Sequence, residues 1–270
     1  MTGHSGPNVL RFPSGAPAAG DVVNLVERLR AAGSVYAEDE AAVLRAEAVD
    51  DAHLEQMVQR RIEGEPLEQI VGWAEFAGLR LVVTPGVFVP RRRTELLARE
   101  AAAVTRPHGQ LLDLCCGVGA VGAAVADARP DAEIHLADID PFAIDCARRN
   151  IPSATDYTGD LFAPLPHNLR FDVIAVNAPY VPTDQIVQMP PEARDHELRA
   201  TLDGGYDGVE VHRRIAADVA RWLSPGGHVL IETAAHLAPL TSAALESGGL
   251  TTRIVQDHEL SATVVIAHRS

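Results

Sequence analysis

The alternation of short apolar runs with helical patterns after Gln110 constrains the fold of this 270-residue chain more than any other feature. Short continuous apolar runs bounded by turn residues are typical of buried parallel strands, and the helical stretches between them supply the crossovers. The sequence therefore predicts an α/β fold with a parallel sheet covered on both faces. The expected strands are 111–114, 134–137, 173–176 and 229–232, and the expected helices are 120–128, 142–149, 209–223 and 237–247.

The end of the chain departs from this alternation. The runs 251–255 and 263–268 lie too close together in sequence for a helical crossover. Parallel neighbours need a crossover of roughly a dozen residues, whereas antiparallel neighbours need only a short turn. We therefore expect an antiparallel hairpin at the end of the sheet.

Three further regions precede the predicted sheet. Residues 1–20 are rich in Gly, Pro and Ser and are predicted to form a disordered tail. Helical patterns near 21–33, 38–49, 51–63 and 66–71 predict a small helical domain over 21–72. Apolar runs on either side of Thr84-Pro85-Gly86 predict a β-hairpin linker over 73–90, with Pro-Gly in the turn. Residues 91–270 would then form the α/β domain.

Composition narrows the range of functions. The formal net charge of −14 argues against a non-specific grip on nucleic acid, which needs clustered basic residues. No apolar run approaches the roughly 18 residues of a membrane-spanning helix, and no signal-like start is visible. The three cysteines form no CxxC pair and the histidines are scattered, so we expect neither disulfides nor a metal site. These features predict a cytoplasmic protein that binds neither nucleic acid nor a membrane.

A glycine-rich loop follows the first predicted strand. Gly117, Gly119 and Gly122 form a G-x-G-x-x-G pattern between a strand and a helix, where backbone N–H groups can approach a ligand. Asp138 ends the next strand about 20 residues further on, where a carboxylate can bind ribose hydroxyls. The same pattern also fits a nicotinamide dinucleotide. The expected cofactor contacts here are Cys115, Cys116, Gly117, Val118, Gly119, Asp138 and Ile139.

Two acidic residues favour S-adenosylmethionine over a dinucleotide. Asp113 lies at the strand end just before the glycines, where it could attract an ammonium group and would repel a pyrophosphate. Asp160 follows a third strand-like segment and is placed to accept a hydrogen bond from an adenine amino group. Leu161 beside it would pack on the adenine ring.

The tetrapeptide Asn177-Ala178-Pro179-Tyr180 ends the apolar run that begins at Phe171. Pro179 has no N–H for a strand ladder, so we expect Asn177 at the carboxyl edge of the sheet, where open α/β folds bind ligands. The tetrapeptide is similar to the Asn-Pro-Pro-Tyr motif of S-adenosylmethionine-dependent enzymes that methylate amino groups.

Together these motifs resemble those of the HemK/PrmC family, protein-glutamine N5-methyltransferases that modify peptide-chain release factors. The resemblance runs from about Arg60 to the C-terminus. It is carried by the segments 64–67, 85–91, 94–95, 113–119, 159–162 and 197–208, with Asp138 as the ribose acid. It implies a class I S-adenosylmethionine-dependent methyltransferase fold, which is Rossmann-like with a seven-stranded sheet and an antiparallel C-terminal strand. It also implies a substrate-recognition role for the N-terminal helical domain.

The chain departs from the family at four positions. Cys115 replaces the first loop glycine, so its φ should be negative or its backbone strained. Ala178 replaces the first proline of the tetrapeptide, which adds an N–H and keeps the carbonyl oxygen. Arg92 replaces the second proline of a Pro-Arg-Pro segment, which is Pro90-Arg91-Arg92 here. Leu198 replaces the proline of a Glu-Pro pair, which is Glu197-Leu198 here. These features resemble a divergent actinobacterial branch of the family.

The resemblance implies a reaction in which an amide nitrogen is held in line with a sulfonium methyl group. We expect the Asn177 side-chain oxygen and the Ala178 carbonyl to accept hydrogen bonds from the substrate NH2 group, with Tyr180 packed against it. Pro179 completes the expected catalytic tetrapeptide, and Asn177 is also an expected cofactor contact. No residue is assigned as a base; His196 and Glu197, after the site, are interpreted as loop hydrogen-bonding groups. The three arginines at 91–93 fit either a solvated helix start or a basic lip over the site.

Four functions therefore remain open. The first is methylation of a protein glutamine, in a release factor or another protein. The second is a small-molecule N-methyltransferase acting on an amine or amide, which the Ala178 change and the arginines weakly favour. The third is methylation of a nucleic-acid amino group, which the negative charge opposes. The fourth is a non-catalytic cofactor-binding protein, which the intact Asn177 and Tyr180 oppose.

Overall fold

The computed structural model describes residues 19–189, 194 and 197–269. Residues 1–18 of the predicted tail lie outside the described residues, and Ala19 already belongs to a helix. The chain divides into two compact units, Met1–Glu63 and Gly64–Ser270. The first unit thus ends at Glu63 and not at Gly72, the boundary predicted from the sequence.

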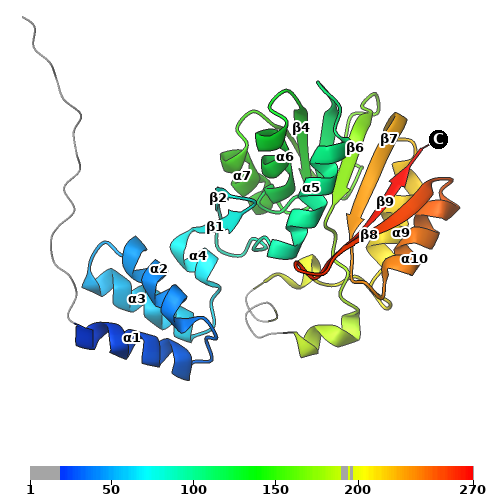
Figure 1. Cartoon of the computed structure of the whole chain (residues 1–270). Helices are drawn as coiled ribbons and strands as arrows, with labels where there is room; N and C mark the ends of the chain where they lie inside the picture. Colours follow the sequence, from blue (N-terminus) through cyan, green and yellow to red (C-terminus); the bar gives the residue numbers. More distant parts are fainter. Residues whose placement is uncertain (1–18, 190–193, 195–196, 270) are drawn as a thin grey trace, which may run out of the picture. The chain divides into compact units, whose positions relative to one another are not determined.

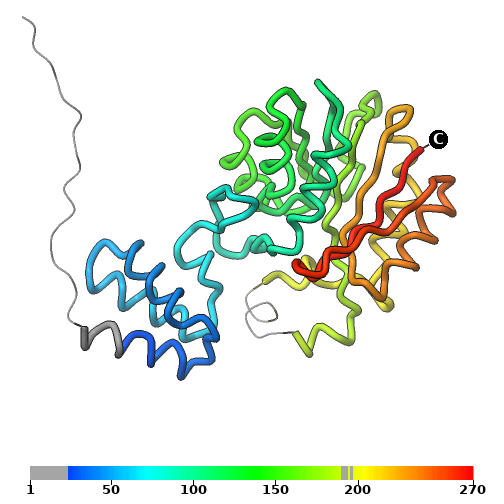
Figure 2. The backbone as a smooth tube through the Cα atoms, viewed as in Figure 1, coloured from blue at the N-terminus to red at the C-terminus, as the bar shows by residue number. Residues whose placement is uncertain are grey.

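The described part of the smaller unit, residues 19–63, contains three helices, α1 (Ala19–Ala31), α2 (Ala37–Glu47) and α3 (Asp51–Ile62), which Figures 1 and 2 show beside one another. Its core includes the fully buried side chains of Leu29, Leu44 and Met57, one from each helix. The Asp50 side chain caps α3 by accepting a hydrogen bond from the backbone N–H of His53 at 2.7 Å. The three helices agree closely with the predicted ones.

The larger unit begins with α4 (Leu67–Val71) and the hairpin of β1 (Trp73–Phe76) and β2 (Leu79–Val82). A turn is present at Thr84-Pro85-Gly86, where the Val87 N–H donates to the Thr84 carbonyl oxygen at 3.2 Å, but the prediction that it closes the hairpin was wrong, because the strands reverse earlier, at Ala77 and Gly78. Their φ angles of 51° and 79° suit a two-residue turn whose twist matches that of the strands. The hairpin packs into the main core of the larger unit and is not a linker.

Residues 87–89 were predicted to form the second strand of that hairpin, but they are not in a strand. The Gln69 side chain instead donates to the carbonyl oxygen of Val87 at 3.1 Å and accepts from the N–H of Gly86 at 3.3 Å. This side chain takes the place of a strand partner for those backbone groups. Val87 and Val89 are nevertheless buried, in the same core as the hairpin.

A seven-stranded sheet forms the centre of the larger unit (Figure 1). Its strands are β3 (Gln110–Leu114), β4 (Glu133–Asp138), β5 (Thr155–Thr158), β6 (Phe171–Val176), β7 (Leu223–Glu232), β8 (Thr251–Asp257) and β9 (Ala262–His268). They lie in the order β5-β4-β3-β6-β7-β9-β8. The first five are parallel, and β9 is antiparallel to both β7 and β8. The predicted parallel sheet with an antiparallel C-terminal hairpin is confirmed.

Helices cover both faces of this sheet, as Figure 1 shows. They are α5 (Glu95–Val104), α6 (Ala120–Ala128), α7 (Pro141–Asn150), α9 (Glu210–Val219) and α10 (Ala238–Ser247), with short 3-10 helices η1 (Arg92–Thr94), η2 (Thr183–Gln188) and η3 (Arg199–Thr201). Strand side chains alternate between the two faces. Leu111 and Val173 join a core with α5, α6 and α7, whereas Leu112 and Ile174 join a second core with α9 and α10.

The helix predicted over 209–223 is shorter than expected and ends at Val219. Leu223 already pairs with Phe171 as the first residue of β7, and the Phe171 N–H donates to the carbonyl oxygen of Trp222 at 2.8 Å. Trp222 is buried in the second core, so the chain turns into the sheet before the helical pattern runs out. No helix of the described part of the chain is long and apolar enough to cross a membrane.

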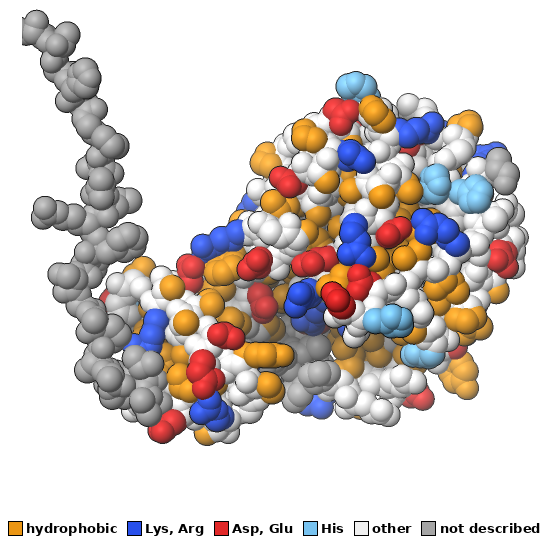
Figure 3. Space-filling model, in the orientation of Figure 1, with side chains coloured by type: hydrophobic (Ala, Val, Ile, Leu, Met, Phe, Trp, Pro, Cys, Tyr) orange, Lys and Arg blue, Asp and Glu red, His pale blue; other side chains and the backbone are white. Residues whose placement is uncertain are grey.

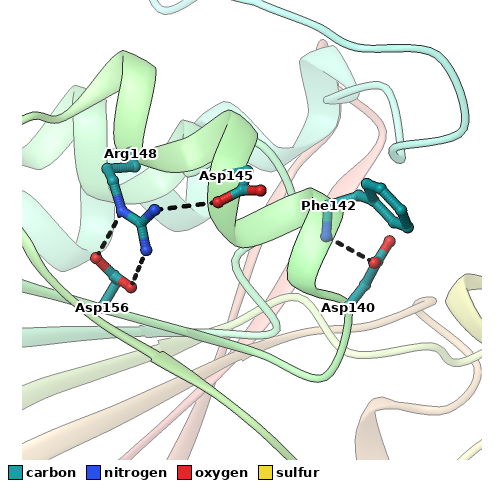
Figure 4. Close-up of polar contacts among 5 residues, drawn as sticks. All are labelled: Asp140, Phe142, Asp145, Arg148 and Asp156. Atoms are coloured by element: carbon teal, nitrogen blue, oxygen red, sulfur yellow. Dashed lines mark hydrogen bonds and ion pairs between the residues drawn. The ribbon is translucent and has the colours of Figure 1, made fainter.

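Contacts along its length anchor α7 (Figure 4). The Asp140 carboxylate caps the helix by accepting from the N–H of Phe142 at 2.9 Å. Towards the other end, Arg148 donates to Asp145 at 3.0 Å and to both carboxylate oxygens of Asp156 in β5, at 2.7 and 3.0 Å. These contacts hold the loop between β4 and α7 in place beside the carboxyl edge of the sheet.

Candidate functional site

A cavity lies at the carboxyl edge of the parallel strands, beside the point where the strand order reverses between β3 and β6. Ligands of open α/β sheets bind at such a point. All the predicted site residues line it except Gly119. Those that do are Asp113, Cys115, Cys116, Gly117, Val118, Asp138, Ile139, Asp160, Leu161, Asn177, Ala178, Pro179 and Tyr180.

In the loop after β3, every second residue from Cys115 to Gly119 has a positive φ angle. Cys115, Gly117 and Gly119 have φ of 60°, 54° and 77°. A negative φ at Cys115 is therefore excluded, and the strained alternative is confirmed, at a cost of roughly 1–2 kcal/mol for a non-glycine residue. A Cβ at Gly117 would meet no atom within 4 Å and would occupy the cavity instead. This glycine keeps space for a ligand against the backbone.

Gly119 and Gly122 serve packing. A Cβ on Gly119 would lie 3.1 Å from the Cβ of Ala147 in α7. A Cβ on Gly122 would lie 3.0–3.2 Å from side chains of Ile151, Ile134 and Leu136. Gly119 does not line the cavity and its missing Cβ faces α7, so its contact with the cofactor stays a prediction. These glycines let α6 approach its neighbours closely.

Asp113 is buried at the end of β3, with 2% of its surface exposed. One carboxylate oxygen accepts a hydrogen bond from the N–H of Gly122 in α6 at 2.8 Å. Burial raises the pKa of Asp113 to about 8, which the Gly122 N–H partly offsets and the charge of Asp138 increases. A buried acid of this kind gains from a cationic partner in the cavity that it lines.

Asp138, at the end of β4, binds the backbone with both carboxylate oxygens. One accepts from the N–H of Gly117 at 2.9 Å and the other from the N–H of Asp140 at 3.0 Å. Burial raises its pKa although these N–H groups lower it. Asp138 therefore braces the glycine loop as well as lining the cavity. Ile139 beside it is 64% exposed at the cavity rim.

Asp160 and Leu161 lie in the loop after β5. The Asp160 carboxylate forms an ion pair with Arg214 of α9 at 2.5 Å, and both side chains are about half exposed, at 51% each. Leu161 has a positive φ of 49°, which turns the backbone at the cavity. Arg214 also lines the cavity and was not predicted to belong to the site.

Asn177 lies directly after β6, in phase with the strand residues that face α5. Its side-chain nitrogen Nδ2 donates to the hydroxyl oxygen of Thr94 at 3.2 Å. The side-chain oxygen Oδ1 is consequently the atom of this amide that is available to a ligand in the cavity. Ala178 is buried, with 1% exposed, and its backbone follows Asn177 along the same wall.

Glu232, the last residue of β7, is the centre of a buried polar cluster under the cavity. Its oxygen Oε1 accepts from the Tyr180 hydroxyl at 3.1 Å and from Arg93 Nε at 3.3 Å. The guanidinium of Arg93 also lies over the Tyr180 ring, 5.8 Å from its centre. Arg93, Thr94 and Tyr180 line the cavity, and Glu232 lies beneath them with 1% exposed.

The three arginines at 91–93 fit neither of the two predicted alternatives fully. Arg91 and Arg93 line the cavity, but each pairs with a buried carboxylate. Arg91 binds Glu197 at 2.5 Å and stacks on Phe88, so Glu197 stabilises the loop through an ion pair and not only through hydrogen bonds. Burial raises the pKa of Glu197 although Arg91 opposes the shift. His196 lies outside the described residues.

Sequence reasoning missed Thr94, Glu232 and Arg214 as parts of the site. Glu232 could have been found by the signal that identified Asp113 and Asp138. Each of these is an acidic residue at the carboxyl end of a predicted buried strand. Thr94 was noted only within the segment 94–95, and Arg214 belongs to a helix without a recognisable motif. Across residues 19–189, 194 and 197–269, no group of three or more His, Cys, Asp or Glu side chains could hold a metal ion.

Residues 78–194 match the family described as MTS, Methyltransferase small domain. A release factor glutamine methyltransferase of Mycolicibacterium smegmatis is 36% identical over 216 residues, which cover 78% of this chain and 76% of the relative. One of Geobacter sulfurreducens is 39% identical over 180 residues, covering 65% of this chain and 63% of the relative's length.

Solved structures show a similar fold at low sequence identity. A methyltransferase from Pyrococcus furiosus has a TM-score of 0.55 at 18% identity, over 71% of this chain and 89% of that one. A Thermus thermophilus 16S rRNA N2 G1207 methyltransferase, in complex with AdoMet and guanosine, has a TM-score of 0.54 at 20% identity, over 73% and 50% of the two chains. These similarities concern the fold alone.

Proposed function

This chain belongs to the release factor glutamine methyltransferase family, and we propose that it methylates the side-chain amide nitrogen of a glutamine in a release factor. As a member of this family it is a methyltransferase that depends on S-adenosylmethionine. The orientation of Asn177 supports the proposed acceptor most strongly. Because Thr94 takes a hydrogen bond from the amide nitrogen, the amide oxygen is left to accept one from a substrate NH2 group.

The cavity fits S-adenosylmethionine. It is lined by buried or half-buried acids, and the missing Cβ of Gly117 leaves room at its wall. We assign Asp113 to the ammonium group, Asp138 to the ribose hydroxyls, and Asp160 with Leu161 to the adenine. When bound, this cofactor supplies an electrophilic methyl group, so the protein needs no strong base to activate the acceptor.

The protein's own residues then have to position a weak nucleophile. The lone pair of an amide nitrogen is delocalised into the carbonyl group, and its N–H groups are hydrogen-bond donors. We assign Asn177 Oδ1 and the Ala178 carbonyl oxygen as their two acceptors, with Pro179 and Tyr180 forming the wall around the planar amide. With the cofactor bound, the nitrogen would bond to the methyl carbon as the carbon–sulfur bond breaks, S-adenosylhomocysteine would leave, and one N–H proton would pass to water. Orientation of this kind can supply several kcal/mol of the barrier reduction.

The surface of the chain fits a protein partner better than a nucleic acid. The formal net charge is −14, and on the face shown in Figure 3 basic and acidic side chains are interspersed over the larger unit without a continuous basic stripe. Non-specific binding of phosphates needs such a stripe. A release factor as substrate would place the protein in the cytoplasm, where translation takes place. We assign substrate recognition to the helical unit as well.

Transfer of labelled methyl groups tests this function. The purified protein is incubated with S-adenosylmethionine carrying a labelled methyl group and with purified release factors, and the products are analysed by mass spectrometry after digestion. We expect one methyl group on a glutamine side chain, and none on a release factor in which that glutamine is replaced. Release factors that acquire no labelled methyl group on any glutamine would contradict the proposal.

Asp113 predicts a proton linkage in cofactor binding. Its raised pKa of about 8 means that the carboxyl group is mainly protonated near pH 6.5 in the free protein. An ammonium group beside it favours the ionised form, whereas an α-amino group with an ordinary pKa of about 7.7–8.0 remains protonated at that pH. We therefore expect binding to release close to one proton, and the affinity for S-adenosylmethionine to rise with pH up to about 8.

Calorimetry near pH 6.5 in buffers of different ionisation enthalpy counts the released protons. The raised pKa of Asp113 also makes the stability of the free protein depend on pH, in the direction opposite to that of cofactor affinity. The folded state holds the extra proton, so the free energy of unfolding falls as the pH rises from the ordinary carboxyl range to about 8. Asp113→Asn, which carries no proton to release here, is the control. Equal proton release by both proteins would show that Asp113 is not the ammonium partner.

A further inference from the structure

The carboxylate of Glu232 lies beneath the cavity, where it binds lining residues but cannot itself reach a substrate. We propose that Glu232 is a positioning residue that, acting through Thr94, holds the Asn177 side chain with its oxygen towards the substrate. This inference rests on the proposed function, since it concerns how the acceptor amide is oriented. Glu232 is 1% exposed, and its second oxygen, Oε2, has no hydrogen-bond partner within the described part of the chain.

The sheet register brings Glu232 and Asn177 together. Val176 in β6 pairs with Ile231 in β7, so the next residues of the two parallel strands, Asn177 and Glu232, are neighbours at the same level. Both continue in phase with the strand residues that face α5. Thr94 ends the short helix η1 immediately before α5, and its hydroxyl lies beside the Glu232 carboxylate, where it opposes the rise in the pKa of Glu232 that burial causes. The hydroxyl thus lies between the carboxylate and the amide.

The chemistry of these three groups determines the direction of the hydrogen bonds. An ionised carboxylate only accepts hydrogen bonds, so we infer that the Thr94 hydroxyl beside it directs its proton towards Glu232, whose oxygen Oε2 has no other donor in the described part of the chain. The hydroxyl oxygen of Thr94 is then free only to accept a hydrogen bond, so the Asn177 side chain turns its nitrogen, Nδ2, towards Thr94. The oxygen end is left for the cavity. A neutral amide in place of Glu232 could donate to Thr94, and the hydroxyl proton could then point to the Asn177 oxygen instead.

The neighbours of Glu232 favour its ionised form. Arg93 brings a positive charge and a donor at 3.3 Å, and the Tyr180 hydroxyl donates at 3.1 Å. Burial raises the pKa of Glu232, and the positive charge of Arg93 and the hydrogen bond from Tyr180 oppose that rise and favour the ionised form. Tyr180 belongs to the same wall of the cavity as Asn177, so the one carboxylate fixes two residues of the tetrapeptide.

Kinetics of the full-length Glu232→Gln protein test this role. With a release factor as substrate we expect kcat to fall about 10–100-fold, with KM for S-adenosylmethionine and its Kd by calorimetry within about threefold of wild type. Asp172→Asn is the matched control. This acid at the start of β6 also binds an arginine, Arg106, and a backbone N–H, that of Gln110, but at the opposite end of the strand. We expect its kcat to be unchanged.

A double-mutant cycle separates positioning from a structural role. Thr94→Val removes the hydroxyl through which Glu232 is inferred to act. If the inference is correct, the double variant Thr94→Val/Glu232→Gln is no slower than the slower single variant, because both changes break the same chain of hydrogen bonds. Additive losses, or a Glu232→Gln protein with wild-type kcat, would overturn the inference. A wild-type protein that fails to methylate any glutamine would instead contradict the proposed function, so the two failures are distinguishable.

Discussion

Replacement of Asn177 by alanine is expected to reduce methyl transfer to a release factor about 10²–10³-fold or more. The substitution removes the side-chain oxygen that we assign to the substrate NH2 group, and with it the contact to Thr94. The affinity for S-adenosylmethionine should stay within about tenfold of wild type, because the residues assigned to the ammonium, ribose and adenine groups belong to other loops. Single-turnover kinetics and calorimetry measure the two effects separately.

Asn168→Ala provides the matched control for this variant. Asn168 is an exposed asparagine that does not line the cavity, so its loss should leave both transfer and binding unchanged. Equal loss of transfer and of cofactor binding in Asn177→Ala would show that Asn177 holds the structure together and does not orient the acceptor.

Replacement of Asp138 by alanine is expected to weaken binding of S-adenosylmethionine about 10²–10⁴-fold. Two charge-assisted hydrogen bonds to ribose hydroxyls would be lost, each worth roughly 1.5–3 kcal/mol. The variant also loses the contact that braces the glycine loop through the N–H of Gly117. Calorimetric titration with S-adenosylmethionine measures the change. Asp145→Ala, which removes a surface acid on α7 while Arg148 keeps its bonds to Asp156, should bind as wild type.

An analogue without ribose hydroxyls distinguishes the two roles of Asp138. If the carboxylate binds the ribose, the wild-type protein should prefer S-adenosylhomocysteine to its dideoxyribose analogue, and the Asp138→Ala protein should lose that preference. An equal preference in both proteins would leave Asp138 with the bracing role alone and would contradict the assignment to the ribose.

Three predicted site residues that the structure brings together at one cavity share one local signal. Asp113, Asp138 and Asn177 each come at the end of an apolar strand, and parallel strands of one sheet bring such ends to one edge. The alternation of strands and helices was equally local, and the seven-stranded sheet confirmed it. A pattern that lies within a short window of sequence could therefore be interpreted without the structure.

The features that were missed depend on contacts across long stretches of chain. The bonds Asn177–Thr94, Tyr180–Glu232 and Arg93–Glu232 join residues separated by 83, 52 and 139 positions. No periodicity reports such contacts. The hairpin turn was misplaced for a related reason, since a Pro-Gly pair is a strong turn signal but Gln69 binds the backbone there.

Gly119 shows the limit of interpreting a motif as a set of ligand contacts. It satisfies the glycine pattern, yet its missing Cβ makes room for Ala147 of α7 and not for a ligand. Cys115 shows the converse. It breaks the family's glycine pattern, yet its backbone adopts the positive φ that a glycine would have taken, and it still lines the cavity.

A crystal structure of the protein with S-adenosylhomocysteine and a glutamine-containing release factor peptide tests the central claim most directly. We predict that the glutamine amide nitrogen lies about 3 Å from Asn177 Oδ1 and from the Ala178 carbonyl oxygen, facing the sulfur atom. A sulfur atom bound away from the end of β6, or an Asn177 oxygen turned away from the amide, would contradict it.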